Sequence, residues 1–212
     1  MVSVKTVSRL TLYRQLLRQL ATSGATHVFS HQLADLARSS AAQVRRDLMV
    51  LKAYGNPRTG YLIDELQKNI DDYLAFSQGI TTILIGVGSL GRALLAYFMT
   101  GRSNIRIVAA FDSDPRKAGR IMSGCRVYLP EELLQQTVGQ NIHCALLAVP
   151  GSEAQKTADL LVKTEIPSIV NFAPVRIKVP PTVFVEDLDV TSSIEKAAFF
   201  GRHMTKTQEM KK

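Results

Sequence analysis

Three glycines mark the junction between an apolar run and an amphipathic segment near the middle of the chain. The run 80–85 predicts a buried strand, the segment 90–98 predicts a helix, and Gly86, Gly88 and Gly91 fit the pattern G-x-G-x-x-G. In that setting the first glycine permits a tight turn, the second lets a pyrophosphate approach the backbone, and the third lets the helix pack closely on the sheet. The start of the helix offers free N–H groups and a positive dipole end to phosphates. The junction therefore predicts a dinucleotide-binding loop.

An acidic residue follows at the distance that this loop requires. Asp112 lies 21 positions after Gly91 and ends a second apolar run, 105–111. A carboxylate at this strand end accepts hydrogen bonds from the adenosine ribose and repels a 2′-phosphate, which favours NAD(H) over NADP(H). Asp114 is a competing choice for this role, and the nearby cations Arg116 and Lys117 could tolerate a phosphate.

The rest of the second half alternates apolar runs with amphipathic segments. Strands are predicted at 142–149, 168–172 and 182–185, and helices at 131–137 and 153–163. Strands alternating with helices indicate an α/β domain with a doubly wound parallel sheet covered on both faces.

The first 78 residues predict a different kind of domain. Helices are expected at 8–22, at 31–38 with Ser30 as its cap, and at 41–51 with Ser40 as its cap. Two short helices joined by a tight turn form a helix-turn-helix. The stretch 54–61 contains Gly, Asn and Pro between tyrosines, which predicts a small hairpin, the wing of a winged helix, before a further helix at 63–76.

The positive charge of the chain is concentrated in this first domain. Residues 1–60 hold nine basic and two acidic side chains, which accounts for +7 of the formal net charge of +8. Such a segment suits an anionic partner, and nucleic acid is the leading candidate, although a solvated basic surface gives the same count.

Other classes of protein fit the sequence less well. No run approaches the roughly 18 apolar residues of a membrane span, and the only cysteines, Cys125 and Cys144, suggest neither a disulfide framework nor a metal site. A reducing cytoplasm is therefore expected. None of the four histidines is placed as the proton donor of a dehydrogenase, and no catalytic residue is assigned.

Taken together, these motifs resemble the Rex family of bacterial redox-sensing repressors over nearly the whole chain. The motifs that carry the resemblance are Arg9-Leu10 with Tyr13, the segment 40–48, Gly55, Gly60 and Tyr61, the loop 86–91, the strand end 109–115, Ala148-Val149-Pro150, and 171–175. The last is the most specific, because a bare dinucleotide-binding enzyme has no reason to carry it.

The resemblance implies a set of site residues. Those for NADH and NAD+ are Gly86, Gly88, Ser89, Leu90, Gly91, Asp112, Ser113, Val149, Pro150, Asn171 and Phe172. Tyr97 and Asp189 are implied to link the redox state to dimer geometry. Those for DNA are Gln43, Arg45 and Arg46 in the recognition helix, Arg58 in the wing, and Arg9.

The resemblance also implies an assembly and a switch. The expected domains are a winged helix at 1–78, a Rossmann domain at 79–190, and a swapped dimerisation helix with a tail at 191–212. The homodimer is expected to bind a palindromic operator in two successive major grooves and to leave it when NADH binds, whereas NAD+ does not drive release.

The chain departs from the family pattern at two places. The wing reads Asn56-Pro57 where a Lys-Arg pair is usual, so one or two groove contacts are absent or displaced. Val190 stands where bulkier apolar residues are common. Two alternatives stay open, a DNA-binding regulator of the same fold that does not sense redox state and a small NAD-dependent oxidoreductase.

Overall fold

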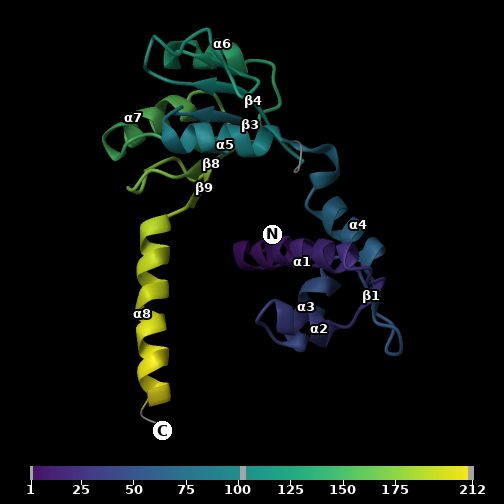
Figure 1. The fold of residues 1–212 in the computed structure, drawn as a ribbon. Coiled ribbons are helices and arrows are strands. Elements are labelled where there is room, and N and C mark those ends of the chain that lie inside the picture. Colours follow the sequence, from purple (N-terminus) through teal and green to yellow (C-terminus); the bar gives the residue numbers. More distant parts are fainter. Residues whose placement is uncertain (1, 101–103, 210–212) are drawn as a thin grey trace. The chain divides into compact units, whose positions relative to one another are not determined.

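The structure, a computed structural model, describes residues 2–100 and 104–209. The chain divides into two compact units, Met1–Gly79 and Ile80–Lys212. Figure 1 shows the helical first unit and the sheet-containing second unit. Each unit has its own apolar core.

The first unit is built around helix α1. This helix spans Val4–Thr22 and begins at Ser3, whose side chain accepts a hydrogen bond from the Thr6 N–H. Its buried residues Leu10, Tyr13 and Leu17 recur at helical spacing and face a core shared with the other three helices. Helix α4, Ile63–Tyr73, packs beside it through Ile63, Leu66 and Ile70.

The expected helix-turn-helix is formed by two short helices. Helix α2 spans Ser30–Leu36 and helix α3 spans Ala41–Met49. The cap predicted at Ser40 is confirmed, because its hydroxyl accepts from the Gln43 N–H at 3.1 Å. The cap predicted at Ser30 is wrong. The helix begins one residue earlier, with Phe29 at the cap position, and the Gln32 side chain accepts from the Phe29 N–H instead.

The wing is smaller than a regular hairpin. Asn56 and Gly60 form one antiparallel bridge with two 2.8 Å backbone hydrogen bonds. Strand β2, Tyr61–Leu62, then pairs with strand β1, His27–Val28, which the sequence did not reveal. Gly60 has φ +78°, and a Cβ there would lie 2.5 Å from the Val28 carbonyl oxygen. The wing is therefore held against strand β1 through a position that accepts only glycine.

The second unit contains a seven-stranded sheet. Its strands are β3 (Ile80–Ile85), β4 (Ile105–Phe111), β5 (Ile121–Met122), β6 (Cys125–Tyr128), β7 (Cys144–Leu147), β8 (Ser168–Asn171) and β9 (Phe184–Asp187), in the order β5-β6-β4-β3-β7-β8-β9. All neighbours are parallel except β5 and β6. Taken alone, the six parallel strands follow the Rossmann order, which reverses between β3 and β7.

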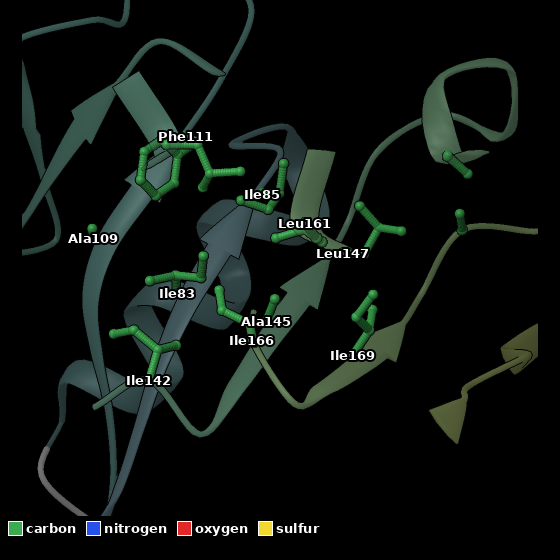
Figure 2. Packing of buried hydrophobic residues seen from close by; sticks show 13 residues of the cluster. Ile83, Ile85, Ala109, Phe111, Ile142, Ala145, Leu147, Leu161, Ile166 and Ile169 are labelled. Carbon is green, nitrogen blue, oxygen red and sulfur yellow. The ribbon is translucent and has the colours of Figure 1, made fainter. Parts of the chain in front are cut away.

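Helices cover the two faces of this sheet because side chains alternate along its strands. Ile83 and Ile85 of β3 belong to a cluster with helices α6 (Leu133–Thr137) and α7 (Gly151–Val162), as Figure 2 shows in part. Leu84 between them faces the opposite cluster, which includes Leu95 of helix α5, Ser89–Met99. The predicted doubly wound α/β fold is confirmed by this arrangement.

The remaining elements are short or terminal. Two single turns of 3₁₀ helix, Phe76–Gln78 and Pro130–Glu132, precede β3 and α6. Helix α8 spans Val190–Glu209 and starts one residue before the predicted dimerisation helix. Among its residues 190–202 nearly every side chain is exposed, including Val190, Ile194, Phe199 and Phe200.

Candidate functional site

The outer two glycines of the loop are required by the protein's own backbone. Gly86 has φ +93°, and a Cβ on it would lie 2.3 Å from the Ala148 carbonyl oxygen. A Cβ on Gly91 would lie 1.9 Å from the Gly86 carbonyl oxygen. Both contacts are far shorter than van der Waals separation, so the turn between β3 and α5 closes only with glycine at these positions.

The middle glycine is different, because nothing in the described chain lies near it. A Cβ on Gly88 would meet no atom within 4 Å, and its φ of −77° is open to any residue. Gly88 is the N-cap of α5, and among the described residues no side chain caps that helix. The first turn of α5, with Ser89 and Leu90, thus offers backbone N–H groups beside an open approach. This geometry fits a pyrophosphate group.

A cavity of about 460 Å³ opens next to this turn at the carboxyl ends of the strands. Six of the residues implied by the family resemblance line it: Gly86, Gly88, Asp112, Ser113, Val149 and Pro150. It also includes Lys117, which the sequence suggested only as a cation that could tolerate a phosphate, and Glu131 and Lys156, which the sequence did not single out. The cavity lies where the strand order reverses, the usual ligand position in open parallel sheets.

Asp112 is a buried carboxylate with three donors around it. Its Oδ2 accepts from the Val87 N–H at 2.8 Å and from the Lys117 ammonium at 2.8 Å, and its Oδ1 accepts from the Asp114 N–H at 2.9 Å. Burial raises its pKa, but these hydrogen bonds outweigh the burial, so the pKa lies below the ordinary value. The group is therefore ionised at neutral pH and is suited to accept ribose hydroxyls.

The competing acid Asp114 is occupied in a different way. Its carboxylate accepts from the Arg116 backbone N–H and is paired with the Arg116 guanidinium at 3.0 Å. These hydrogen bonds lower the pKa of Asp114 to about 2. Arg116 is largely exposed, so this ion pair contributes little to stability. The geometry favours Asp112 over Asp114 as the ribose acceptor, and it places Lys117 rather than Arg116 against that acceptor.

The polar residue at the end of β8 has a structural role in this conformation. Asn171 is buried, its amide nitrogen donates to the Val175 carbonyl at 2.8 Å and to Asp187 at 2.7 Å, and its amide oxygen accepts from the Ala173 N–H. These bonds fix the turn that follows β8. Phe172 beside it is half-buried against the α5 side of the sheet.

Tyr97 and Asp189 lie in separate surroundings within the second unit. Tyr97 is 67% exposed on α5, and its ring contacts that of Phe98 edge to face. Asp189 precedes α8, and its carboxylate accepts from the Ser192 N–H at 2.9 Å, as an N-cap does. The implied pairing of Tyr97 with Asp189 remains a prediction.

The outer face of α3 carries two arginines that suit DNA, next to the polar side chain of Gln43. Arg45 and Arg46 are exposed, and Gln43 is half-buried. Arg45 donates to the Ser30 hydroxyl of α2, and Arg46 donates to the Gln43 amide oxygen at 2.9 Å. Helix α3 therefore presents two cations held by neighbouring polar groups, the arrangement of a recognition helix.

The wing keeps one exposed cation. Arg58 lies at its tip, and its backbone N–H donates to the Asn56 side-chain oxygen at 2.8 Å. Asn56, which departs from the family pattern, therefore closes the turn with its side chain instead of offering a charge.

Arg9 is engaged inside the first unit. Its guanidinium binds Asp47 of α3 through two hydrogen bonds of 2.6 and 2.7 Å. The sequence placed Arg9 among the DNA ligands and gave Asp47 no role. A pair separated by 38 positions leaves no local signal.

Metal sites and membrane-spanning helices are both absent from residues 2–100 and 104–209. No cluster of histidine, cysteine and acidic side chains there has the geometry of a metal site. None of the described helices has the length and apolarity to cross a bilayer.

Both units of the chain are similar to known protein families. Residues 1–48 match a family model described as "Putative DNA-binding protein N-terminus", and residues 78–175 match one described as "CoA binding domain". The chain is 37% identical over 195 residues to the redox-sensing transcriptional repressor Rex of Leuconostoc citreum, covering 92% of this chain and 90% of that protein.

Solved structures of RSP, a Rex-family repressor, are also similar to the chain at 28% sequence identity. The RSP complex with β-NADH has a TM-score of 0.86 and covers 99% of this chain and 98% of RSP. The RSP complex with β-NAD+ and operator DNA has a TM-score of 0.87, with coverage of 100% and 97%.

Proposed function

The chain belongs to the Rex family of redox-sensing transcriptional repressors, and we propose that it binds operator DNA as a homodimer in the cytoplasm and is released from that DNA by NADH. The family is one of repressors and not of enzymes. Both cysteines are free thiols, which suits a reducing compartment.

One observation carries the nucleotide part of this proposal. Gly88 is the only glycine of the fingerprint whose missing side chain leaves open space within the described structure. The fold would accept a side chain at this position, whereas a ligand that approaches the backbone there would not, so a glycine is expected if such a ligand binds. NAD(H) fits the adjoining cavity, with the N–H groups of Ser89 and Leu90 facing the pyrophosphate and Asp112 accepting the ribose hydroxyls.

Other residues of the cavity complete the site. Ser113, Val149 and Pro150 line the cavity, and Asn171 holds the next strand end in shape. The bound nucleotide supplies its redox state as the signal, and this chain's residues bind and orient it. We extend the site to Phe172, Tyr97 and Asp189 on the basis of the family resemblance.

The DNA part of the proposal rests on the first unit. Helix α3 presents Arg45 and Arg46, and the wing presents Arg58, all with exposed side chains. In a dimer, two such helices are expected to enter successive major grooves about 34 Å apart on a palindrome. The RSP complex with operator DNA supports operator DNA as the partner.

Helix α8 supports the dimer. Four of its large apolar side chains, Val190, Ile194, Phe199 and Phe200, are each more than half exposed. Burying the exposed half of each of these side chains on association contributes about 1 kcal/mol or more. In a homodimer, a second copy of the chain would cover these apolar side chains.

Fluorescence anisotropy tests the proposal. The probe is a fluorescein-labelled palindromic duplex that the protein itself has selected from a randomised pool, and salt is held constant because phosphate contacts make affinity salt-dependent. NADH, NAD+, NADPH and coenzyme A are titrated separately. We expect NADH to release the duplex at concentrations where NAD+ and coenzyme A leave it bound. If no nucleotide releases the duplex, the protein is a DNA-binding regulator without redox sensing.

A further inference from the structure

A single buried carboxylate joins helix α1 to the recognition helix. Asp47 of α3 is 3% exposed and accepts four hydrogen bonds. Two come from the Arg9 guanidinium, one from the Tyr13 hydroxyl at 3.0 Å and one from the Gln43 amide nitrogen at 2.9 Å. An ionised carboxylate has about four acceptor sites, so this group is fully used.

Gln43 continues the chain of contacts toward the protein surface. Its amide nitrogen donates to Asp47, and its amide oxygen accepts from the Arg46 guanidinium at 2.9 Å. A glutamine that reads adenine needs its amide nitrogen and oxygen together, facing the same base. Both ends of the Gln43 amide are engaged within the protein instead. This geometry suits a side chain that holds its neighbour rather than one that reads a base.

Arg46 is the exposed end of the chain of contacts. Its guanidinium gives one N–H to Gln43, and the side chain lies on the exposed face of α3. Arginine reads guanine by donating two parallel hydrogen bonds to O6 and N7, which requires a fixed orientation of the guanidinium plane. A side chain with four rotatable bonds loses less entropy on binding when its orientation is already set.

We propose that Asp47 and Gln43 are positioning residues that orient the Arg46 guanidinium for base recognition, and that Arg9 neutralises Asp47 and does not bind a DNA phosphate. The inference rests on the proposed DNA-binding function and assigns roles within its recognition helix. Asp47 acts on DNA through Gln43 and Arg46, and the interior of the first unit thereby sets the direction of the reading side chain.

The role of Arg9 follows from its contacts. Its side chain is 29% exposed, and two of its nitrogens face the two carboxylate oxygens of Asp47. The Nη2 atom also reaches the Thr6 hydroxyl at 3.3 Å. The hydrogen bonding that Arg9 donates to Asp47 raises the pKa of Arg9, so the pair stays ionised and carries no net charge. A neutral pair releases no counterion from DNA.

A double-mutant cycle tests the proposal on the full-length protein. Gln43→Met keeps the side-chain length and removes the amide, Arg46→Met keeps an unbranched apolar stem and removes the guanidinium, and the probe is the selected duplex described above. Each bidentate base contact accounts for about 5- to 150-fold in affinity, and the dimer loses two of them, so we expect Arg46→Met to weaken binding by about 30-fold or more. Gln43→Met is expected to weaken binding by less, and the double variant to match Arg46→Met alone.

The chain offers a matched control for this cycle. Arg45 is an exposed arginine on the same helix, and it is held by Ser30 and not by Gln43. The effects of Gln43→Met and Arg45→Met are therefore expected to multiply, as they do for independent sites. Thermal unfolding of each variant checks that it is folded.

Three results would overturn the inference. The first is that the factors of Gln43→Met and Arg46→Met multiply, because Gln43 then contacts DNA on its own. The second is that Arg46→Met leaves affinity unchanged. The third is that Arg9→Met lowers the slope of log affinity against log salt by about 2, the signature of one lost phosphate contact in each subunit of the dimer. A wild-type protein that selects no duplex at all would instead overturn the proposed function, and this inference with it.

Discussion

Replacing Gly88 by alanine should weaken NADH binding while leaving the stability of the fold nearly unchanged. The backbone at Gly88 is extended, and the new Cβ meets no atom of the described chain within 4 Å. Alanine has fewer accessible conformations than glycine in the unfolded chain, and this stabilises the folded protein by about 0.4–1 kcal/mol. It is also a poorer N-cap than glycine by a similar amount. The free energy of unfolding of Gly88→Ala should therefore stay within about 1 kcal/mol of wild type.

The effect of the same substitution on NADH binding should be large. The added methyl group occupies the approach of the pyrophosphate to the first turn of α5. Each hydrogen bond between a backbone N–H and a charged group contributes about 1.5–3 kcal/mol. Loss of one such bond weakens NADH affinity by about 10- to 150-fold.

Gly91→Ala is the matched comparison, with the opposite pattern. Alanine is favoured over glycine inside a helix by about 1 kcal/mol, so helix propensity alone predicts stabilisation. The Cβ, however, would lie 1.9 Å from the Gly86 carbonyl oxygen, and both partners are backbone. Overpacking of this kind costs about 3 kcal/mol or more, which lowers the Tm of the second unit by roughly 10 °C.

Two measurements decide between these expectations. The fluorescence of NADH itself reports its binding, and the chain contains no tryptophan to complicate the signal. Differential scanning calorimetry without nucleotide reports stability. A Gly88→Ala protein that binds NADH as wild type does would refute the assignment of the pyrophosphate to this turn. A Gly88→Ala protein as unstable as Gly91→Ala would show that the middle glycine serves the fold.

Three further predictions concern other parts of the chain. Asp47→Asn should destabilise the first unit by about 2–3 kcal/mol at neutral pH, since it breaks a buried pair with a partly exposed partner. The folded pKa of Asp47 lies below the ordinary value of 3.8, so the contribution of its ionised form to stability is present above that pH and is lost as the pH falls further. Urea unfolding should therefore show the difference in stability between Asp47→Asn and wild type becoming smaller in acid. Lys117→Met removes the cation beside Asp112. By Coulomb's law at a high effective dielectric constant, it should weaken the affinity for NADPH relative to NADH by about 5-fold or more. Calorimetric titration with both nucleotides checks this, and an unchanged ratio of the two affinities would place Lys117 away from the ribose. Gly60→Ala should destabilise the first unit by about 2 kcal/mol and weaken binding of the selected duplex, because φ +78° and the Val28 carbonyl both exclude a side chain; a stable variant with normal DNA affinity would contradict the role of this wing anchor.

The elements that sequence reasoning identified are those with local signals. The strand 80–85, the glycines and the acid at Asp112 form a pattern within about thirty residues, and the structure has β3, α5 and β4 at these places. The Ser40 cap is a contact between residues three apart. Such features follow from spacing and turn chemistry alone.

The features that sequence reasoning missed depend on contacts between distant residues or on very short elements. Strand β1 has two residues, and only its pairing with β2 across 33 and 35 positions makes it a strand. Asp47 meets Arg9 across 38 positions. The β5–β6 hairpin carried a usable signal, because Ser123-Gly124 between apolar residues is a two-residue turn and both residues have positive φ. Ser30 was predicted as the cap because serine is a favoured cap residue, but it is the first residue of the helix and the cap position is Phe29, one residue earlier.

The coupling between nucleotide and DNA is tested most directly by measuring NADH affinity with and without a saturating amount of the selected duplex. Linkage requires that the duplex weaken NADH by the same factor by which NADH weakens the duplex. Our account predicts equal factors, of about 5- to 150-fold, and a much smaller factor for NAD+. An NADH affinity that is the same with and without DNA would contradict the account, because the two units would then bind their ligands independently.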